Sequence, residues 1–78
     1  MGENKNMNFS LSEIGKRIKI LIRENNYTEA KLAEELNIDL HELLEILDGK
    51  KEISIEQILI ITRIFNLSIE ECVRTFFS

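Results

Sequence analysis

Five helix-starting signals divide a chain that contains no proline. Proline interrupts helices, and glycine, which weakens them, occurs at only three positions. Each signal is a Ser, Thr or Asp whose side chain can accept a hydrogen bond from the first turn of a helix. The five residues are Ser10, Thr28, Asp39, Ser54 and Ser68. Apolar residues recur three and four positions apart after each signal, and no segment alternates as a strand does, so the sequence predicts an all-α fold.

The helix boundaries follow from these signals and from the breaks between them. The three serine signals are each followed three residues later by Glu or Gln, which makes a capping box: Ser10 with Glu13, Ser54 with Gln57, and Ser68 with Glu71. Asp39 with Glu42 is a looser version, and Thr28 is a plain cap. Breaks fall at Asn25–Asn26, Asn37, Gly49–Lys51 and Asn66. We therefore expect helices over residues 11–25, 29–36, 40–48, 55–65 and 69–76.

The chain is long enough for one small domain. Residues 10–78 contain all five expected helices and form that domain, whereas residues 1–9 are mostly polar and are expected to be a flexible N-terminal tail. The positions that recur on one side of each of the first four helices form the expected core: Ile14, Ile18, Leu21, Leu32, Ala33, Leu36, Leu43, Ile46, Leu47, Ile58, Ile61, Thr62 and Phe65.

Composition argues against several classes of protein. One cysteine, Cys72, excludes an internal disulfide and fits a reducing compartment. The longest purely aliphatic run, residues 58–61, is far too short to span a membrane, so we expect a cytoplasmic protein without membrane association. The single histidine and the single cysteine fall on different expected helices, and no glycine-rich phosphate loop is present. We therefore expect no enzyme, no metal site and no cofactor.

An ordered set of residues runs through nearly the whole chain. Its members are Gly15, Ile18, Leu21, Thr28, Leu32, Ala33, Ile38, Leu43 and Ile46, followed by the turn "DGKKEIS" and the closing stretch "ILIITRIFNLSIEEC". Their joint order and spacing resemble the XRE helix-turn-helix family, of the phage Cro and lambda-repressor type. The resemblance implies a compact five-helix lambda-repressor-like bundle in which the second and third helices form the helix-turn-helix.

The family resemblance also implies a dimer that binds double-stranded operator DNA, with the third helix in the major groove. The candidate DNA-binding residues that it carries over are Thr28, Glu29, Leu40, His41, Glu45, Lys50 and Lys51. Thr28 and the two lysines would hold phosphates, and the three residues of the third helix would face base edges. Glu29 stands where the family usually has glutamine, and its carboxylate would repel a phosphate.

The charge distribution opposes this role. Residues 28–48 carry seven acidic residues against Lys31, a net charge of −6, whereas residues 10–27 carry four basic against two acidic residues, a net charge of +2. DNA presents about one negative charge per 1.7 Å of duplex. The base-facing positions also lack the arginine or glutamine that makes two-pronged contacts with a base.

Two functions are therefore considered. The first is a small DNA-binding transcription regulator that acts as a dimer on a palindromic operator. The second is a protein-interaction module of the same fold, an antagonist or co-regulator whose acidic third helix does not bind DNA. Leu40 and Leu44 favour the second function, because they lie four residues apart, off the core side of the helix, among acidic residues. The same pair could instead pack on a neighbouring helix.

A homodimer surface is expected near the end of the chain. Ile60 and Ile64 form a second apolar stripe beside the core positions of their helix, and the chain ends with Phe76 and Phe77 close to its terminus. More apolar surface is present here than one small core needs, which favours a second copy of the chain as partner. The alternative is that the two phenylalanines fold back and complete the core of the monomer.

Overall fold

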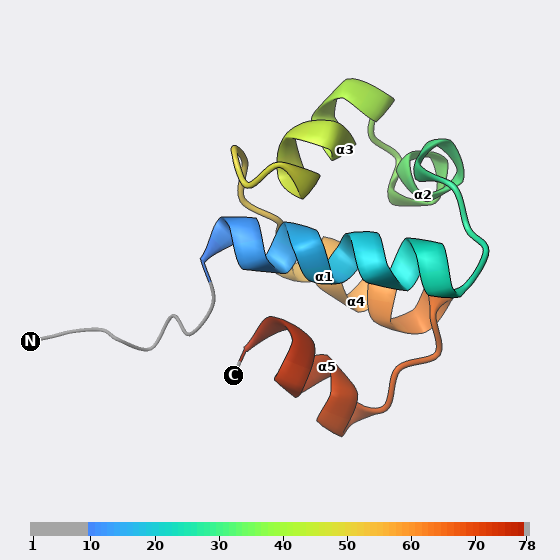
Figure 1. Ribbon diagram of the computed structural model, residues 1–78. Helices are drawn as coiled ribbons and strands as arrows, with labels where there is room; N and C mark the ends of the chain where they lie inside the picture. The colour runs from blue at the N-terminus through green and yellow to red at the C-terminus, as the bar shows by residue number, and fades with distance from the viewer. Residues whose placement is uncertain (1–9, 78) are drawn as a thin grey trace, which may run out of the picture.

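Five helices and short connections make up the structure, a computed structural model that describes residues 10–77 (Figure 1). The helices are α1 (Leu11–Glu24), α2 (Glu29–Leu36), α3 (Leu40–Leu47), α4 (Ile55–Ile64) and α5 (Ile69–Phe76). Each begins at the expected residue and ends at it or one residue earlier, so the predicted all-α, five-helix fold is confirmed. The expected tail, residues 1–9, lies outside the described residues. Within residues 10–77 no helix is long and apolar enough to cross a membrane.

Each helix starts at its predicted cap. The side chains of Ser10, Thr28, Asp39, Ser54 and Ser68 all accept a hydrogen bond from the backbone N–H three residues later. The capping box is complete at Ser54 and at Ser68, where the Gln57 or Glu71 side chain also accepts from the backbone of the cap. A cap satisfies an N–H group that would otherwise lack a partner, and each is worth about 1 kcal/mol.

The breaks between helices use left-handed backbone. Asn26, Asn37 and Asn66 have φ angles of 54°, 60° and 55°, and Gly49 has a φ angle of 77°. Apart from glycine, asparagine is the residue that enters this region most readily, because its short polar side chain can bond locally. The residues predicted as breaks therefore end the first four helices for a specific conformational reason.

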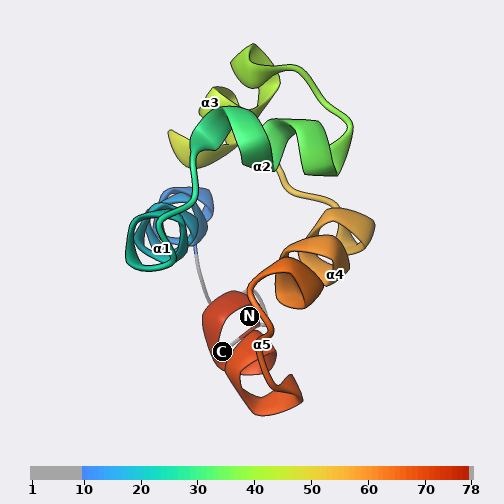
Figure 2. The ribbon, with the colours of Figure 1, turned by 90° about the vertical axis from the view of Figure 1, so that its right-hand side faces the viewer.

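The helices lie in three tiers (Figures 1 and 2). The α2–α3 pair occupies one end of the molecule, α1 and α4 lie on opposite sides of the middle, and α5 closes the other end. One core runs through all three tiers, and its buried members are Ile14, Ile18, Ile22, Leu32, Ala33, Leu36, Leu43, Ile46, Leu47, Ile58, Ile61, Phe65, Cys72 and Phe76. Two expected core residues, Leu21 and Thr62, are only partly buried.

The last helix completes the monomer core. Cys72 and Phe76, four residues apart, form its buried side, and Phe76 is only 2% exposed. The Thr62 hydroxyl of α4 lies 3.2 Å from Cys72 Sγ, which links the last two helices. The expectation that Phe76 takes part in a dimer surface is wrong in this structure, because its ring is used to cover the α5 end of the core. Phe77, the next residue, is 45% exposed.

The closest approach between α1 and α3 occurs at Gly15. A Cβ atom at this position would run into the Leu47 carbonyl oxygen, and it would lie 2.7 Å from the carbonyl carbon of Leu47 and 3.0 Å from the Ile46 oxygen. These atoms belong to the backbone and cannot move aside as a flexible side chain could. Glycine at position 15 therefore sets the distance between α1 and α3.

We predict that Gly15→Ala destabilises the protein by about 1–3 kcal/mol, because overpacking of a close backbone contact has this magnitude. At an exposed helix position the same change would stabilise the protein by about 1 kcal/mol. The sign of the change in the free energy of unfolding therefore distinguishes a close backbone contact at Gly15 from an exposed position. The measurement is the free energy of unfolding from urea denaturation, with Lys16→Ala, an exposed neighbour on the same helix, as the control. An unchanged or higher stability of Gly15→Ala would contradict the close approach.

Candidate nucleic-acid interface

A tight turn fixes α3 across the end of α2. Asn37 is left-handed, and the Ile38 N–H donates to the Ala33 carbonyl oxygen at 3.0 Å. The small Ala33 side chain is buried at the contact between the two helices, and Ile38 packs against the core. The Asp39 carboxylate then caps α3 by accepting from the Glu42 N–H at 2.8 Å. This is the geometry of a helix-turn-helix, with one helix laid across another and a few residues between them.

The outer side of α3 is exposed. Leu40 and Leu44 are 42% and 37% exposed, which confirms that they lie off the core rather than within it. His41 and Glu45, the other predicted base-facing residues, lie on the same helix with His41 Nε2 3.6 Å from Glu45 Oε2. A protonated His41 is thus paired with the acid one turn further along. The structure therefore presents all three predicted base-facing positions, Leu40, His41 and Glu45, to the outside.

The start of α2 offers backbone N–H groups at the same end of the molecule. The Thr28 hydroxyl accepts from the Lys31 N–H at 3.0 Å, and Thr28 and Glu29 are both exposed. The N-terminus of a helix carries a partial positive charge and unpaired N–H groups, which suit a phosphate. Glu29 places a carboxylate at this point and offsets part of that attraction.

The two predicted phosphate-binding lysines differ in their surroundings. Lys50 is exposed, and no residue between 10 and 77 forms an ion pair with it. Its backbone N–H donates to the Glu45 carbonyl oxygen at 2.9 Å, which closes the turn after α3. Lys51 instead donates from Nζ to Glu42 Oε2 at 2.9 Å. This hydrogen bond raises the pKa of the Lys51 ammonium above its ordinary value of 10.5, so Lys51 stays fully charged at neutral pH.

Other basic residues near α3 are also paired with acids. Lys19 Nζ lies 3.8 Å from Asp48 Oδ1 just beyond the end of α3, and Lys31 Nζ lies 3.7 Å from Glu35 Oε2 on α2. The pairs of Glu42 with Lys51 and of Lys19 with Asp48 were not predicted from the sequence. Their members are nine and 29 residues apart, so no helical spacing connects them and only the fold brings them together.

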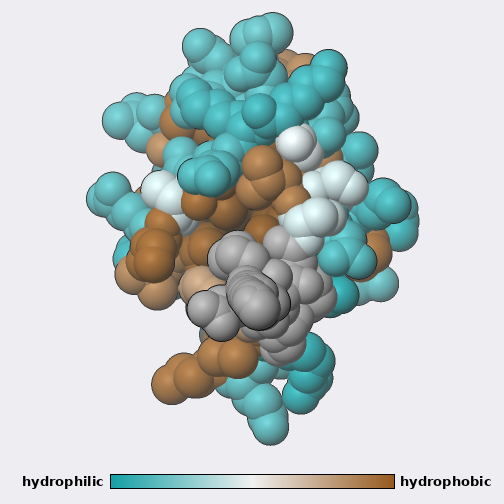
Figure 3. All heavy atoms as spheres, turned by 90° about the vertical axis from the view of Figure 1, so that its left-hand side faces the viewer, coloured by the Kyte–Doolittle hydropathy of each residue, from teal (hydrophilic) through white to brown (hydrophobic). Residues whose placement is uncertain are grey.

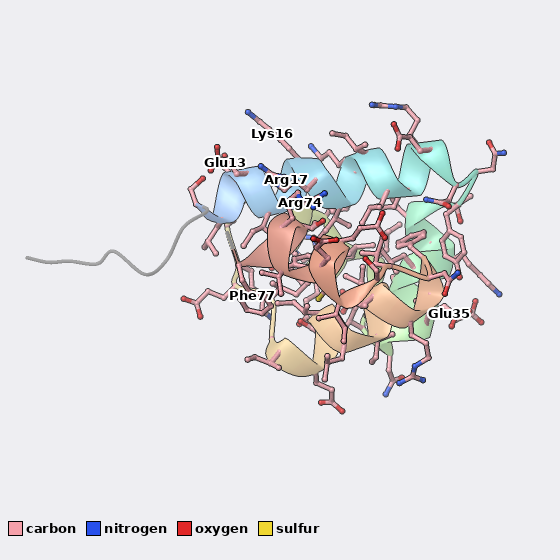
Figure 4. All side chains as sticks on the ribbon, turned by 90° about the horizontal axis from the view of Figure 1, so that it is seen from below. Glu13, Lys16, Arg17, Glu35, Arg74 and Phe77 are labelled. Atoms are coloured by element: carbon pink, nitrogen blue, oxygen red, sulfur yellow. The ribbon has the colours of Figure 1, made fainter. Side chains whose placement is uncertain are left out.

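The two ends of the molecule differ in polarity. In Figure 3 hydrophilic residues cover the end formed by α2 and α3, and hydrophobic residues gather towards α4 and α5. A shallow hollow of about 180 Å³ lies between α1 and α5, lined by Arg17, Ile20, Leu21 and Thr75. In Figure 4 Arg17, one of the lining residues, projects from α1. The hollow is away from the α2–α3 surface and smaller than the usual site for a small molecule.

Comparison with known proteins identifies the fold. No family model and no curated protein matches the chain. Among solved structures, the clp gene regulator ClgR from Corynebacterium glutamicum is similar with a TM-score of 0.75 at 19% identity, over 88% of this chain and 73% of that chain. The restriction-modification controller protein C.AhdI from Aeromonas hydrophila is similar with a TM-score of 0.69 at 19% identity, over 80% of this chain and 94% of that chain.

A mutant of a second restriction-modification controller protein, C.Esp1396I, is similar with a TM-score of 0.71 at 22% identity, over 87% of this chain and 91% of that chain. The similarity thus extends over most of each chain, although few residues are identical. The chain therefore has the helix-turn-helix fold of these regulators, as its resemblance to the XRE family implied.

Proposed function

We propose that this chain is a small cytoplasmic transcription regulator that binds double-stranded DNA as a dimer on a palindromic operator. The observation that carries the proposal is the exposed outer side of α3, held across α2 at one end of the molecule. A helix held in this way can enter the major groove while the start of the preceding helix meets the DNA backbone. The structurally similar controller and regulator proteins share this arrangement of the fold.

The proposed contacts follow from the chemistry of each exposed group. Thr28, with the N–H groups of the first turn of α2, binds one phosphate, and Lys50 binds another. His41 donates to a guanine, Glu45 accepts from a cytosine amino group, and Leu40 contacts a thymine methyl group. Only the last three contacts depend on the base sequence.

The acidic residues make binding to random DNA weak. Seven acids lie in residues 28–48, and the lysines at positions 19, 31 and 51 each form an ion pair with one of them. Affinity for random DNA comes almost entirely from basic residues that neutralise phosphates. A regulator with so few available basic residues at its binding surface therefore depends on its contacts with bases.

The dimer surface is proposed to lie on exposed apolar residues of α4 and α5. Ile55 and Leu59 form a stripe on α4, and Ile69, 84% exposed, lies at the start of α5. They replace most of the surface expected from the sequence: Ile60 and Ile64 are partly buried against the core, and Phe76 is fully buried. Apolar side chains this exposed are typical of a surface that a second protein covers.

A second candidate function has its own observation. Leu40 and Leu44 are exposed together, and the acids Glu42, Glu45 and Asp48 lie around them on α3 and at its end. An apolar pair within an acidic rim is complementary to a protein with an apolar patch and basic residues around it. On this alternative the chain is an antagonist or co-regulator that covers a partner's basic surface.

We predict that selection from a random duplex pool at low salt enriches a palindromic sequence. The logarithm of its binding constant falls linearly with the logarithm of salt concentration. Lys50→Ala makes this slope less steep by about 0.9 per subunit, or about 1.8 for the dimer, because each subunit loses one phosphate contact. Lys16→Ala, an exposed lysine of α1, is the control and leaves the slope unchanged. Failure to enrich any sequence with folded protein would overturn DNA binding and leave the protein-interaction module.

We predict that the double variant Leu59→Glu/Ile69→Glu is monomeric in sedimentation equilibrium, whereas the unaltered protein is a dimer. Two carboxylates on each copy would have to be buried without partners in the dimer, which opposes association. Leu44→Glu, an equally drastic change of an exposed leucine on α3, is the control and leaves the dimer intact. Circular dichroism confirms that the variants keep their helices. If the double variant had the same dimer dissociation constant as the unaltered protein, the interface would have to lie elsewhere.

A further inference from the structure

The bond between Lys51 and Glu42 ties the turn after α3 to the first turn of that helix. Lys51 Nζ lies 2.9 Å from Glu42 Oε2, whereas the other ion pairs at α2 and α3 span 3.6–3.8 Å. The two side chains are 48% and 31% exposed, so neither is sealed in the protein. A charge-assisted hydrogen bond of this length has a definite geometry, yet at an exposed site it can be exchanged for another partner.

The placement of the pair matters for DNA binding. Glu42 is the third residue of α3, in the half of the helix that would enter the groove, and its N–H is held by Asp39. Lys51 follows the left-handed Gly49 and the Lys50 N–H bond to Glu45, in the turn that would meet the DNA backbone. The bond therefore draws a phosphate-binding ammonium onto a base-reading helix.

Releasing Lys51 to a phosphate leaves the Glu42 carboxylate without its partner beside a polyanion. That arrangement is unfavourable unless another donor replaces the ammonium. In the major groove such donors are the exocyclic amino groups of cytosine and adenine, and carboxylates accept from the cytosine amino group in particular. A DNA site that places such an amino group beside Glu42 lets both side chains change partner together. Glu42 then accepts a hydrogen bond from the base, and Lys51 donates one to the phosphate.

We propose that Glu42 is a specificity-determining residue that releases Lys51 to the DNA backbone only where a base places its amino group within hydrogen-bond reach of the Glu42 carboxylate. The inference rests on the proposed DNA binding. On random DNA, Lys51 stays on Glu42 and contributes no phosphate contact. On the operator, it contributes one. Through Glu42, the identity of one base thus decides whether Lys51 binds a phosphate, so the protein binds more phosphates on the operator than on random DNA.

The test compares Glu42→Gln with the unaltered protein on the selected operator and on random duplex. The variant lacks the carboxylate that holds Lys51, so we expect its salt slope on random DNA to steepen by about 0.9 per subunit and its affinity there to rise about tenfold per subunit at 0.1 M salt. The slope on the operator stays the same, and the ratio of operator to random affinity falls. Adding Lys51→Ala to Glu42→Gln returns the slope on random DNA to that of the unaltered protein and removes most of the gain in affinity.

Glu34→Gln is the matched control. It removes the same charge from an exposed acid of α2 that forms no ion pair within residues 10–77, so it raises both affinities slightly and changes neither slope. Equal slopes for Glu42→Gln and Glu34→Gln on random DNA would overturn the role of Glu42 while leaving DNA binding intact. Failure of the unaltered protein to bind any duplex would overturn the proposed function, and this inference with it.

A measurement without DNA tests the bond itself. Side-chain NMR of Lys51 follows the titration of its ammonium. We expect Glu42→Gln to lower the pKa of Lys51, because the hydrogen bond that Lys51 donates to Glu42 is the main cause of its elevation. Glu34→Gln leaves this pKa unchanged. An unaltered Lys51 pKa in Glu42→Gln would show that the two side chains are not bonded in solution and would overturn the proposal.

Discussion

The close approach of α1 and α3 is the constraint on which the rest of the structure depends. Gly15 lets the backbone of α1 lie against the carbonyl groups of Ile46 and Leu47, where any larger residue would collide. Eight residues are too few to form a stable helix in water alone, so α3 depends on such contacts. The glycine contact holds its C-terminal half, and the turn at Asn37 holds its N-terminal half against α2. With both ends fixed, its remaining side is exposed.

That exposed side combines an accessible shape with unfavourable charge. The acids of α3 serve its stability and solubility: Asp39 caps the helix, and Glu42, Glu45 and Asp48 lie close to Lys51, His41 and Lys19 respectively. The two lysine pairs also offset positive charges that would otherwise attract DNA. A surface of this kind gains little from general electrostatic attraction and must distinguish its partners by specific contacts. The ion pairs of α3 and its neighbours thus contribute to the stability of the protein and also make its binding depend on specific contacts.

Local features made most of the fold predictable. The hydroxyl of Ser54 or Ser68 bonds an N–H only three residues away, and Asn26, Asn37 and Asn66 adopt the left-handed conformation within their own turns. Such interactions are encoded in a few consecutive residues and need no tertiary partner. The exposure of Leu40 and Leu44 was predicted for the same reason, since the core stripe of a helix can be read from its spacing.

The sequence by itself thus determined where each helix begins and ends, which side of α3 faces outward, and that its charge is acidic. Only the tertiary structure decided that Phe76 belongs to the core and that Ile55, Leu59 and Ile69 are among the exposed apolar residues of α4 and α5. It also decided that Lys51 is bonded to Glu42. The physical reason is the separation along the chain of the residues that interact. Caps and turns act within one helical turn, whereas burial and ion pairing depend on which distant segments the packed core brings together.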